Sequence, residues 1–382
     1  MPDKVDVLIL AASCGGGHLQ AARALVEGFQ LTYPELRCTA VNFFREISPT
    51  TDRLLEISYR QAVLRAPLLW KGLYRLTDCS GPQSHLECRL SRLFFRRTCS
   101  LLEDYNPRTL VSTHPVVSRI LGEMKRRSLV ALPFATVLTD QSLHSEWLNP
   151  CTDLYLAGSD YVRARLIGRG VPANRIAVTG IPISPKFALP RDRIATRKAL
   201  GLSPDLPVVL IMVGAQGLLP DAADLCAALA ASPLPLQVVF VAGRDEGLRA
   251  QVQRVTAGSR QPVFVLGFVT NIEEWMAASD ILVSKAGGLT TAEALARELP
   301  LVIVHPIPGQ EEDNTRFLVH AGAAVRVEKV QEAAHTVQEI LTSPTKLAVM
   351  RRAAARIARP DSARHAARAI ADLLCEQAES SL

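Results

Sequence analysis

The stretch Ser284-Lys-Ala-Gly-Gly-Leu-Thr-Thr-Ala-Glu293 is the strongest indication of the fold class of this chain. An apolar run, Ile281 to Val283, precedes it, and a helix with Glu293 in its first turns is predicted to follow its two glycines. Glycine lets backbone approach a ligand closely, and a helix N-terminus offers unpaired N–H groups to an anion. The stretch therefore predicts a strand, a glycine loop and a helix that bind a nucleotide diphosphate, with Glu293 at the ribose.

A second unit of the same kind follows. The apolar run Leu301 to Val304 is predicted to be a strand, and Pro308-Gly-Gln-Glu-Glu-Asp-Asn314 a polar loop after it. Pro308 and Gly309 indicate a turn at the strand end. Because ligands gather at the carboxyl ends of parallel strands, we expect Gln310, Glu311 and Asn314 to contact a sugar.

The rest of the chain alternates apolar runs with predicted helices, which is typical of an α/β protein with parallel sheets. The other predicted strands are residues 5–11, 38–44, 109–112, 133–138, 154–157, 176–179, 208–213, 236–242 and 263–266. Among the helices between them, one is predicted to begin at the cap Ser159-Asp160 and run to Gly168, and another to begin at the cap Asn271 and run to Ala278. Three prolines between residues 182 and 190 indicate a domain boundary. We predict two doubly wound, Rossmann-like domains facing each other across a cleft. They comprise residues 1–187 and 188–358, and residues 359–382 form a terminal helix.

Residues 45–105 interrupt this alternation with helical sequence too long for a single crossover helix. Residues 53–97 hold nine basic side chains against three acidic ones, interleaved with Leu, Trp and Tyr. Such a mixture is typical of a helix that lies on anionic lipid. The alternative is an ordinary amphipathic insert that packs on the sheet. The side chains expected at the membrane are Arg60, Arg65, Trp70, Lys71 and Arg75.

Charge and composition narrow the possible partners. Residues 1–185 hold 22 Lys and Arg against 16 Asp and Glu, so the whole formal net charge of +6 lies in this half. The excess favours an anionic partner: a membrane surface, nucleic acid or a phosphorylated substrate. No apolar run is long enough for a transmembrane helix, and the sequence shows no signal peptide. Eight scattered cysteines without a C-x-x-C pair indicate free thiols in a reducing compartment.

Polar residues after the predicted strands are the candidate catalytic groups. Gly15-Gly-Gly-His18 follows the first strand, and His18 at a helix start either caps the helix or acts as a general base. His114 suits a site and a structural role equally well. Asp140, with His144 close by in the sequence, either orients His18 or is itself the base.

Taken in order, these motifs resemble a known family. Over nearly its whole length the chain is similar to GT-B glycosyltransferases of the group of monogalactosyldiacylglycerol synthases and processive diacylglycerol glucosyltransferases. It is more distantly similar to the enzyme that adds N-acetylglucosamine to the lipid precursor of peptidoglycan. The motifs that carry the resemblance are Gly-Gly-Gly-His18, His114-Pro115, Thr139-Asp140, Gly180-Ile-Pro-Ile, Lys285-Ala-Gly-Gly, Glu293-Ala-Leu and Gly309-Gln-Glu-x-x-Asn314.

The resemblance implies a GT-B fold whose terminal helix crosses back onto the N-terminal domain. It implies an inverting hexosyltransferase of glycolipid synthesis that moves glucose or galactose from a UDP-sugar to diacylglycerol or a glycosyl-diacylglycerol. Such an enzyme would use no cofactor or essential metal and no nucleic acid. It would be cytoplasmic and peripheral, on the inner face of the cell membrane.

The resemblance also assigns roles to residues. The N-terminal domain would present the acceptor, with His18 as the leading base, Asp140 as the second candidate, and Gly16, Gly17 and His114 beside them. The C-terminal domain would hold the donor, with uracil near Phe268, the diphosphate near Gly287, and the hexose after the next strand. The donor residues implied are Gly214, Gly217, Phe268, Val269, Gly287, Gly288, Leu289, Thr290, Glu293, Gln310, Glu311 and Asn314.

Three other functions stay open. A UDP-N-acetylglucosamine 2-epimerase would use the same fold, although it would not need the basic insert. An N-acetylglucosaminyltransferase would act on a lipid-diphosphate acceptor. A non-catalytic lipid- or nucleotide-binding protein is disfavoured, because His18, Asp140, Glu293 and Gln310 are all present.

Overall fold

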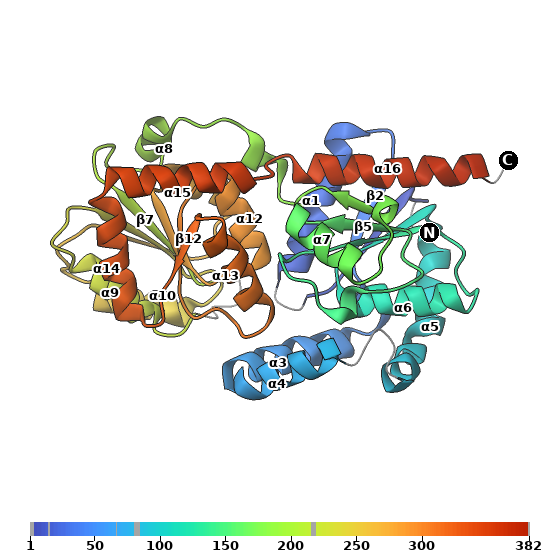
Figure 1. Cartoon of the computed structure of the whole chain (residues 1–382). Coiled ribbons are helices and arrows are strands. Elements are labelled where there is room, and N and C mark those ends of the chain that lie inside the picture. The colour runs from blue at the N-terminus through green and yellow to red at the C-terminus, as the bar shows by residue number, and fades with distance from the viewer. Residues whose placement is uncertain (1–3, 14–15, 66, 80–84, 215–218, 381–382) are drawn as a thin grey trace. The chain divides into compact units, whose positions relative to one another are not determined.

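The computed structural model describes residues 4–13, 16–65, 67–79, 85–214 and 219–380 (Figure 1). The chain folds into two compact units. Unit 1 comprises Met1–Pro185, Pro308–Gln310 and Asp361–Leu382, and unit 2 comprises Lys186–Ile307 and Glu311–Pro360. The chain thus leaves unit 1 in the proline-rich segment, contributes Pro308–Gln310 to it, and returns to it with its last helix.

The described part of unit 1 contains a six-stranded parallel sheet in the order β2-β1-β3-β4-β5-β6. All five residues of the central strand β1 are buried, because helices cover both faces of the sheet. The strands are β1 (Val7–Ala11), β2 (Cys38–Asn42), β3 (Thr109–Ser112), β4 (Phe134–Val137), β5 (Leu154–Ala157) and β6 (Ile176–Val178).

Two groups of helices cover this sheet. On one face α1 and α16 pack through Leu25, Phe29 and Ile370. Gly28 permits their close approach, since a Cβ there would lie 2.5 Å from the carbonyl oxygen of Ala363. Helices α2, α5 and α6 pack on the other face. The helices of unit 1 are α1 (Gly17–Thr32), α2 (Phe43–Ile47), α3 (Pro49–Arg65), α4 (Pro67–Cys79), α5 (His85–Tyr105), α6 (Pro115–Arg126), α7 (Asp160–Gly168), α16 (Ser362–Ser380) and the short 3-10 helices η1 (Ser145–Trp147) and η2 (Ala173–Arg175).

Unit 2 contains a second six-stranded parallel sheet within its described residues, in the order β12-β11-β10-β7-β8-β9. The chain enters it through η3 (Pro185–Ala188). Its strands are β7 (Val208–Met212), β8 (Gln237–Val241), β9 (Val263–Leu266), β10 (Ile281–Ser284), β11 (Leu301–Ile303) and β12 (Ala324–Arg326). Its helices are α8 (Arg193–Ala199), α9 (Ala222–Ala230), α10 (Glu246–Val255), α11 (Ile272–Ala278), α12 (Gly288–Ala296), α13 (Gln310–His320), α14 (Val330–Leu341) and α15 (Pro344–Ile357).

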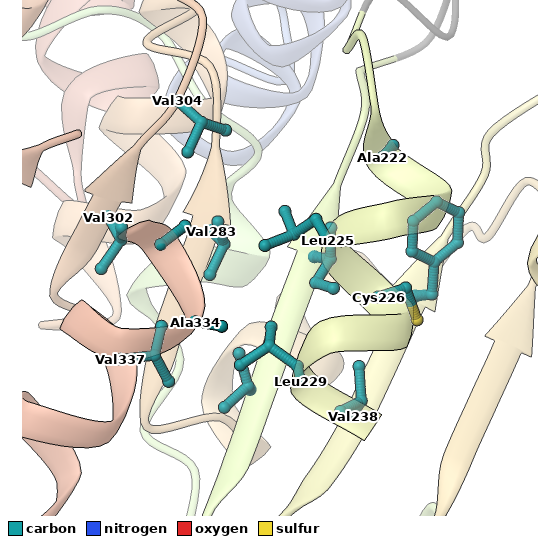
Figure 2. Packing of buried hydrophobic residues seen from close by; sticks show 14 of the residues in the cluster. Ala222, Leu225, Cys226, Leu229, Val238, Val283, Val302, Val304, Ala334 and Val337 are labelled. Carbon is teal, nitrogen blue, oxygen red and sulfur yellow. The ribbon is translucent and has the colours of Figure 1, made fainter. Parts of the chain in front are cut away.

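The core of unit 2 is aliphatic. Figure 2 shows Leu225 and Leu229 of α9 pointing toward Val283 of β10 and Val337 of α14. These side chains are fully buried. Because few large rings are available, branched aliphatic residues from two helices and the central strands fill the space.

Several predicted elements are confirmed residue for residue. The strands at residues 109–112, 154–157 and 263–266 have the predicted bounds, and the described residues between 45 and 105 are helical except Ser48. The helix predicted after residue 159 begins with Ser159 as its cap, because the Ser159 hydroxyl accepts a hydrogen bond from the Val162 N–H. Strong local signals therefore decided these elements.

Three predictions about local structure are wrong. The strand at residues 38–44 ends at Asn42, whose side chain caps α2 by accepting from the Arg45 N–H. Residues 310–314 form the first turns of α13 instead of a loop, where acidic side chains favour the positive end of the helix dipole. Asn271 precedes α11, but its amide donates to the Glu274 carboxylate and does not cap the helix.

Candidate functional site

Each sheet has a point at which the winding direction of the chain reverses. In unit 1 this point lies between β1 and β3; the segment after β1 leads to His18, and Thr113 follows β3. In unit 2 it lies between β7 and β10, which are followed by Gly214 and by Gly287. Open parallel sheets bind ligands beyond the carboxyl ends of the strands at such points. The topology therefore gives each unit one candidate site.

His18 lies at the start of α1, and its Nδ1 atom is held by groups from two other loops. Nδ1 lies 2.6 Å from the carbonyl oxygen of Thr113 and 3.1 Å from the hydroxyl of Thr139. A carbonyl oxygen only accepts hydrogen bonds, so Nδ1 carries the proton and donates it. The neutral ring then has its lone pair on Nε2, the form that a general base requires.

Burial keeps the His18 ring neutral. It lowers the pKa of His18 to about 4, although the bond to the Thr113 carbonyl works in the opposite direction. The residue as a whole remains partly exposed. Its ring centroid lies 4.7 Å from that of His114 and 6.2 Å from that of Trp147.

His114 has a structural task in this group. Its Nδ1 accepts a hydrogen bond from the Val116 N–H and so caps α6. Burial, followed by the nearby charges of His18 and Arg119, holds its pKa well below the ordinary histidine value. Asp140 directly follows Thr139, which contacts His18, and its negative charge contributes to a raised pKa of Tyr74. The structure thus brings the loops of His18, His114 and Asp140 to one edge of the sheet.

In unit 2, α12 begins at Gly288 with Gly287 at its cap position, and no side chain caps it in the described residues. The N–H groups of Gly288, Leu289 and Thr290 are those that an anion at this helix end would meet. Glu293 lies farther along the same helix. Burial, and then the negative charge of Glu273, raises the pKa of Glu293 to about 8. Its carboxyl group is therefore largely protonated at neutral pH and can both donate and accept hydrogen bonds.

Charged and amide side chains connect the loops around Gly287. The Lys285 ammonium forms an ion pair with one carboxylate oxygen of Glu311, and the other accepts from the Ile307 N–H at 2.8 Å. The buried Asn314 amide donates to the Ala286 carbonyl at 2.9 Å. Two of the predicted sugar ligands, Glu311 and Asn314, therefore brace the loop that contains Lys285.

The residues predicted to bind the uracil and those of the glycine loop after β7 differ in exposure and contacts. The Phe268 ring is 49% exposed, and the Arg244 guanidinium lies 5.1 Å from its centroid. Val269 beside it is partly exposed. Gly214 has a φ of 77°, and a Cβ there would lie 3.3 Å from the Lys285 side chain. Gly217 lies outside the described residues.

Two helices of the insert, α3 and α4, lie side by side (Figure 1). Large apolar side chains are exposed on both of them, with Leu54 at 65% and Leu76 at 68%. Arg75 is exposed and Lys71 partly exposed. The side chains of Arg60, Arg65 and Trp70 lie outside the described part of the structure.

Known proteins resemble the chain along nearly its whole length. The family model for monogalactosyldiacylglycerol (MGDG) synthase matches residues 18–183, and the glycosyltransferase family 28 C-terminal domain matches residues 208–372. The processive diacylglycerol beta-glucosyltransferase of Bacillus cytotoxicus is 30% identical over 375 residues, which are 97% of this chain and 93% of that protein. The one from Bacillus subtilis is 31% identical over 355 residues, 91% and 89% of the two chains. The chain belongs to the glycolipid-synthase branch of glycosyltransferase family 28.

Solved structures show the fold of this glycosyltransferase. Acinetobacter baumannii MurG has a TM-score of 0.62 at 16% identity, covering 97% of this chain and all of that one. UDP-GlcNAc 2-epimerase from Neisseria meningitidis, bound to UDP-GlcNAc, has a TM-score of 0.60 at 13% identity, also covering 97% and 100%. The predicted family and the predicted GT-B fold, with two Rossmann-like parallel sheets, are confirmed.

The described part of this glycosyltransferase contains neither a candidate membrane-spanning helix nor a candidate metal cluster. No described helix combines the length and the apolar character needed to cross a bilayer. The described His, Cys, Asp and Glu side chains form no group of three or more that could hold a metal ion.

Sequence reasoning missed three residues of these sites. Thr113 and Thr139 orient His18, yet they lie 95 and 121 residues away in the chain, and no role was assigned to either, although Thr139 stands in the Thr139-Asp140 motif. Lys285 lies in the stretch from Ser284 to Glu293, directly after the buried strand β10. The sequence could have predicted an ion pair for this lysine, since a charged side chain next to a buried strand usually has a partner.

Proposed function

We propose that this glycosyltransferase moves glucose or galactose from a UDP-sugar to diacylglycerol or a glycosyl-diacylglycerol, with inversion, at an anionic membrane surface. The names of its Bacillus relatives support the acceptor class and the β-configured product. One observation carries the chemistry: Nδ1 of His18 donates to the Thr113 carbonyl, which leaves Nε2 as a proton acceptor at the carboxyl edge of the unit 1 sheet.

In the proposed reaction, the acceptor hydroxyl attacks the anomeric carbon and loses its proton to His18 Nε2. A positioned base contributes about 10²–10⁴-fold to the rate. The Thr113 carbonyl remains bound to Nδ1–H while the ring becomes positive, so it stabilises the imidazolium that forms. A single displacement inverts a UDP-α-hexose to a β-linked glycolipid. Asp140 is the second candidate base.

The departing UDP gains negative charge as the glycosidic bond breaks. The first N–H groups of α12 would face the diphosphate, and Lys285 lies next to that helix start. Such preorganised donors stabilise a leaving group without a metal ion. Glu293 would bind the ribose, Phe268 and Val269 the uracil, and Gly214 and Gly217 would let the diphosphate approach the backbone.

The hexose would lie at the start of α13. Gln310 supports this role because its side-chain carbonyl oxygen is buried without a hydrogen-bond partner within the described residues. Glu311 and Asn314 contribute by bracing the loop of Lys285, and they offer polar groups at the same edge of the sheet.

Membrane contact would be made by α3 and α4. Exposed apolar side chains beside exposed arginines support it, since such a surface favours anionic lipid. A peripheral, cytoplasmic enzyme on the inner face of the cell membrane would meet both its lipid acceptor and a soluble UDP-sugar.

The test is incubation of the purified protein with UDP-glucose or UDP-galactose and diacylglycerol-containing vesicles, followed by mass analysis of the lipids. The expected result is a hexosyl-diacylglycerol whose anomeric proton shows a β-linkage by NMR. Absence of both a glycolipid product and UDP release would contradict the proposal. Isomerisation of UDP-N-acetylglucosamine without acceptor would favour an epimerase, and transfer to a lipid diphosphate would favour the N-acetylglucosaminyltransferase.

A further inference from the structure

The α3–α4 pair is attached to unit 1 at two places, and both attachments reach the segments that surround His18. We propose that this pair is a positioning element of the active centre in addition to a membrane contact, with Asp52 and His144 as positioning residues. The inference rests on the proposed function, because it assumes that His18 is the base.

The first attachment is at the start of α3. The Asp52 carboxylate accepts a 2.6 Å hydrogen bond from the Ser13 hydroxyl and bonds of 3.2 and 3.1 Å from the Asn42 amide. Ser13 lies between β1 and His18, and its carbonyl oxygen accepts from the Gly16 N–H. Asp52 thus connects the insert directly to the segment that leads into α1.

The second attachment is at the end of α4. The Glu146 N–H donates to Nδ1 of His144, and Nε2 of the same ring donates to the Tyr74 carbonyl at 2.9 Å. The Asp78 carboxylate accepts from the N–H and the hydroxyl of Ser145, both at 2.8 Å. Burial raises the pKa of Asp78, but these bonds outweigh it and hold the pKa below its ordinary value.

Both attachments reach segments that contact or lead into His18. The loop that receives α4 begins with Thr139, whose hydroxyl contacts Nδ1 of His18, and ends with Trp147, whose ring lies beside that of His18. On α4, Tyr74 and Asp78 face this loop, whereas Arg75 and Leu76 between them are exposed. One face of the helix therefore holds the catalytic loops, and another is exposed.

The decisive experiment compares Asp52→Asn with Glu56→Gln. Both substitutions remove one negative charge from α3. Glu56 lies one helical turn after Asp52, and its side chain is exposed. Turnover is measured with UDP-glucose and a short-chain diacylglycerol dissolved as a monomer, so that membrane docking is not required. We expect Asp52→Asn to lower kcat about 10-fold to 100-fold without changing KM for UDP-glucose, because a small displacement of a base is costly. Glu56→Gln should match the wild type.

A double-mutant cycle identifies the contact involved. Ser13→Ala should lower kcat in the same way, and the combined variant should be no slower than the slower single variant, since both remove one interaction. Additive effects, or an Asp52→Asn variant as active as Glu56→Gln, would overturn the role of Asp52.

The second attachment supplies an independent test if the Asp52 variants unfold. His144→Ala removes the donor to the Tyr74 carbonyl, and His144→Gln restores a donor at the position of Nε2. We expect kcat to fall with Ala and to recover at least in part with Gln, at equal thermal stability and equal binding to anionic vesicles. Equal loss in both variants would overturn the role of His144. A wild-type protein that glycosylates no glycerolipid at all would instead contradict the proposed function.

Discussion

His18 in unit 1 and Glu311 in unit 2 both lie beyond the carboxyl ends of parallel strands. Uncharged groups hold His18 in place, whereas Glu311 is held by the charged side chain of a lysine. His18 is oriented by a carbonyl oxygen and a hydroxyl, and burial keeps it uncharged. Glu311 is paired with Lys285 and a backbone N–H. An uncharged pocket keeps the histidine deprotonated, as the proposed base must be before it accepts a proton, whereas a charged pocket suits the proposed recognition of an anionic donor. In the proposed mechanism, the corresponding edges of the two sheets therefore serve two kinds of chemistry, according to the side chains placed there.

The largest effect is expected from His18→Ala. Removing the proposed base should lower kcat about 10²–10⁴-fold. Donor affinity should not change, since the residues proposed at the diphosphate, Gly287 to Thr290, belong to unit 2. Steady-state kinetics together with calorimetric titration of UDP checks both points. Unchanged turnover would remove His18 from the base role and make Asp140 the first candidate.

Glu311→Gln should act mainly on stability. It leaves the Lys285 ammonium without its carboxylate, and breaking a buried pair costs about 3 kcal/mol or more. Chemical denaturation should show this loss in the transition of unit 2, together with weaker UDP binding. Asp313→Asn is the matched control on the same helix. Its partner Arg316 is exposed, so that pair should contribute less than about 1 kcal/mol. Equal stability of the two variants would contradict the bracing role of Glu311.

Glu293→Gln should reveal a pH dependence in unit 2. The pKa of Glu293 is raised in the folded chain, so its contribution to stability is complete below pH 4.5 and is lost as the pH rises through about 8. Relative to the Gln variant, which does not ionise, the wild type should lose roughly 2 kcal/mol across this interval, allowing for its partial exposure. Denaturation curves at pH 5, 7 and 9 measure the difference. A constant difference would show that the carboxyl titrates normally.

The smallest effect is expected at the insert. Arg75→Ser should weaken binding to anionic vesicles about fivefold, because one basic side chain near such a surface contributes about 1 kcal/mol. Arg254→Ser makes the same charge change at an exposed position of unit 2 and should not alter binding. Sedimentation with vesicles of anionic and of neutral lipid measures both variants. Equal binding of the two variants would exclude Arg75 from the membrane contact.

Local sequence signals predicted much of the fold. The strand at residues 109–112 is an uninterrupted buried segment, and Ser159 offered a hydroxyl at the right distance from its helix. Residues 310–314 were assigned to a loop because Pro308, Gly309 and a cluster of acidic residues suggested one. The same acidic residues favour the first turn of a helix, and the structure resolved this ambiguity.

The candidate site was predicted as a set of positions, and its chemistry depends on contacts that the sequence does not display. Glycines, a histidine and carboxylates after apolar runs determined that ligands bind at two strand edges, because strand direction places those residues together. Only the tertiary structure decided that Nδ1 of His18 donates to Thr113, that Glu311 pairs with Lys285, and that Asp52 connects the insert to Ser13. The physical reason is distance along the chain: hydrogen bonds and ion pairs act over about 3 Å in space, whereas their partners lie 95, 26 and 39 residues apart in sequence.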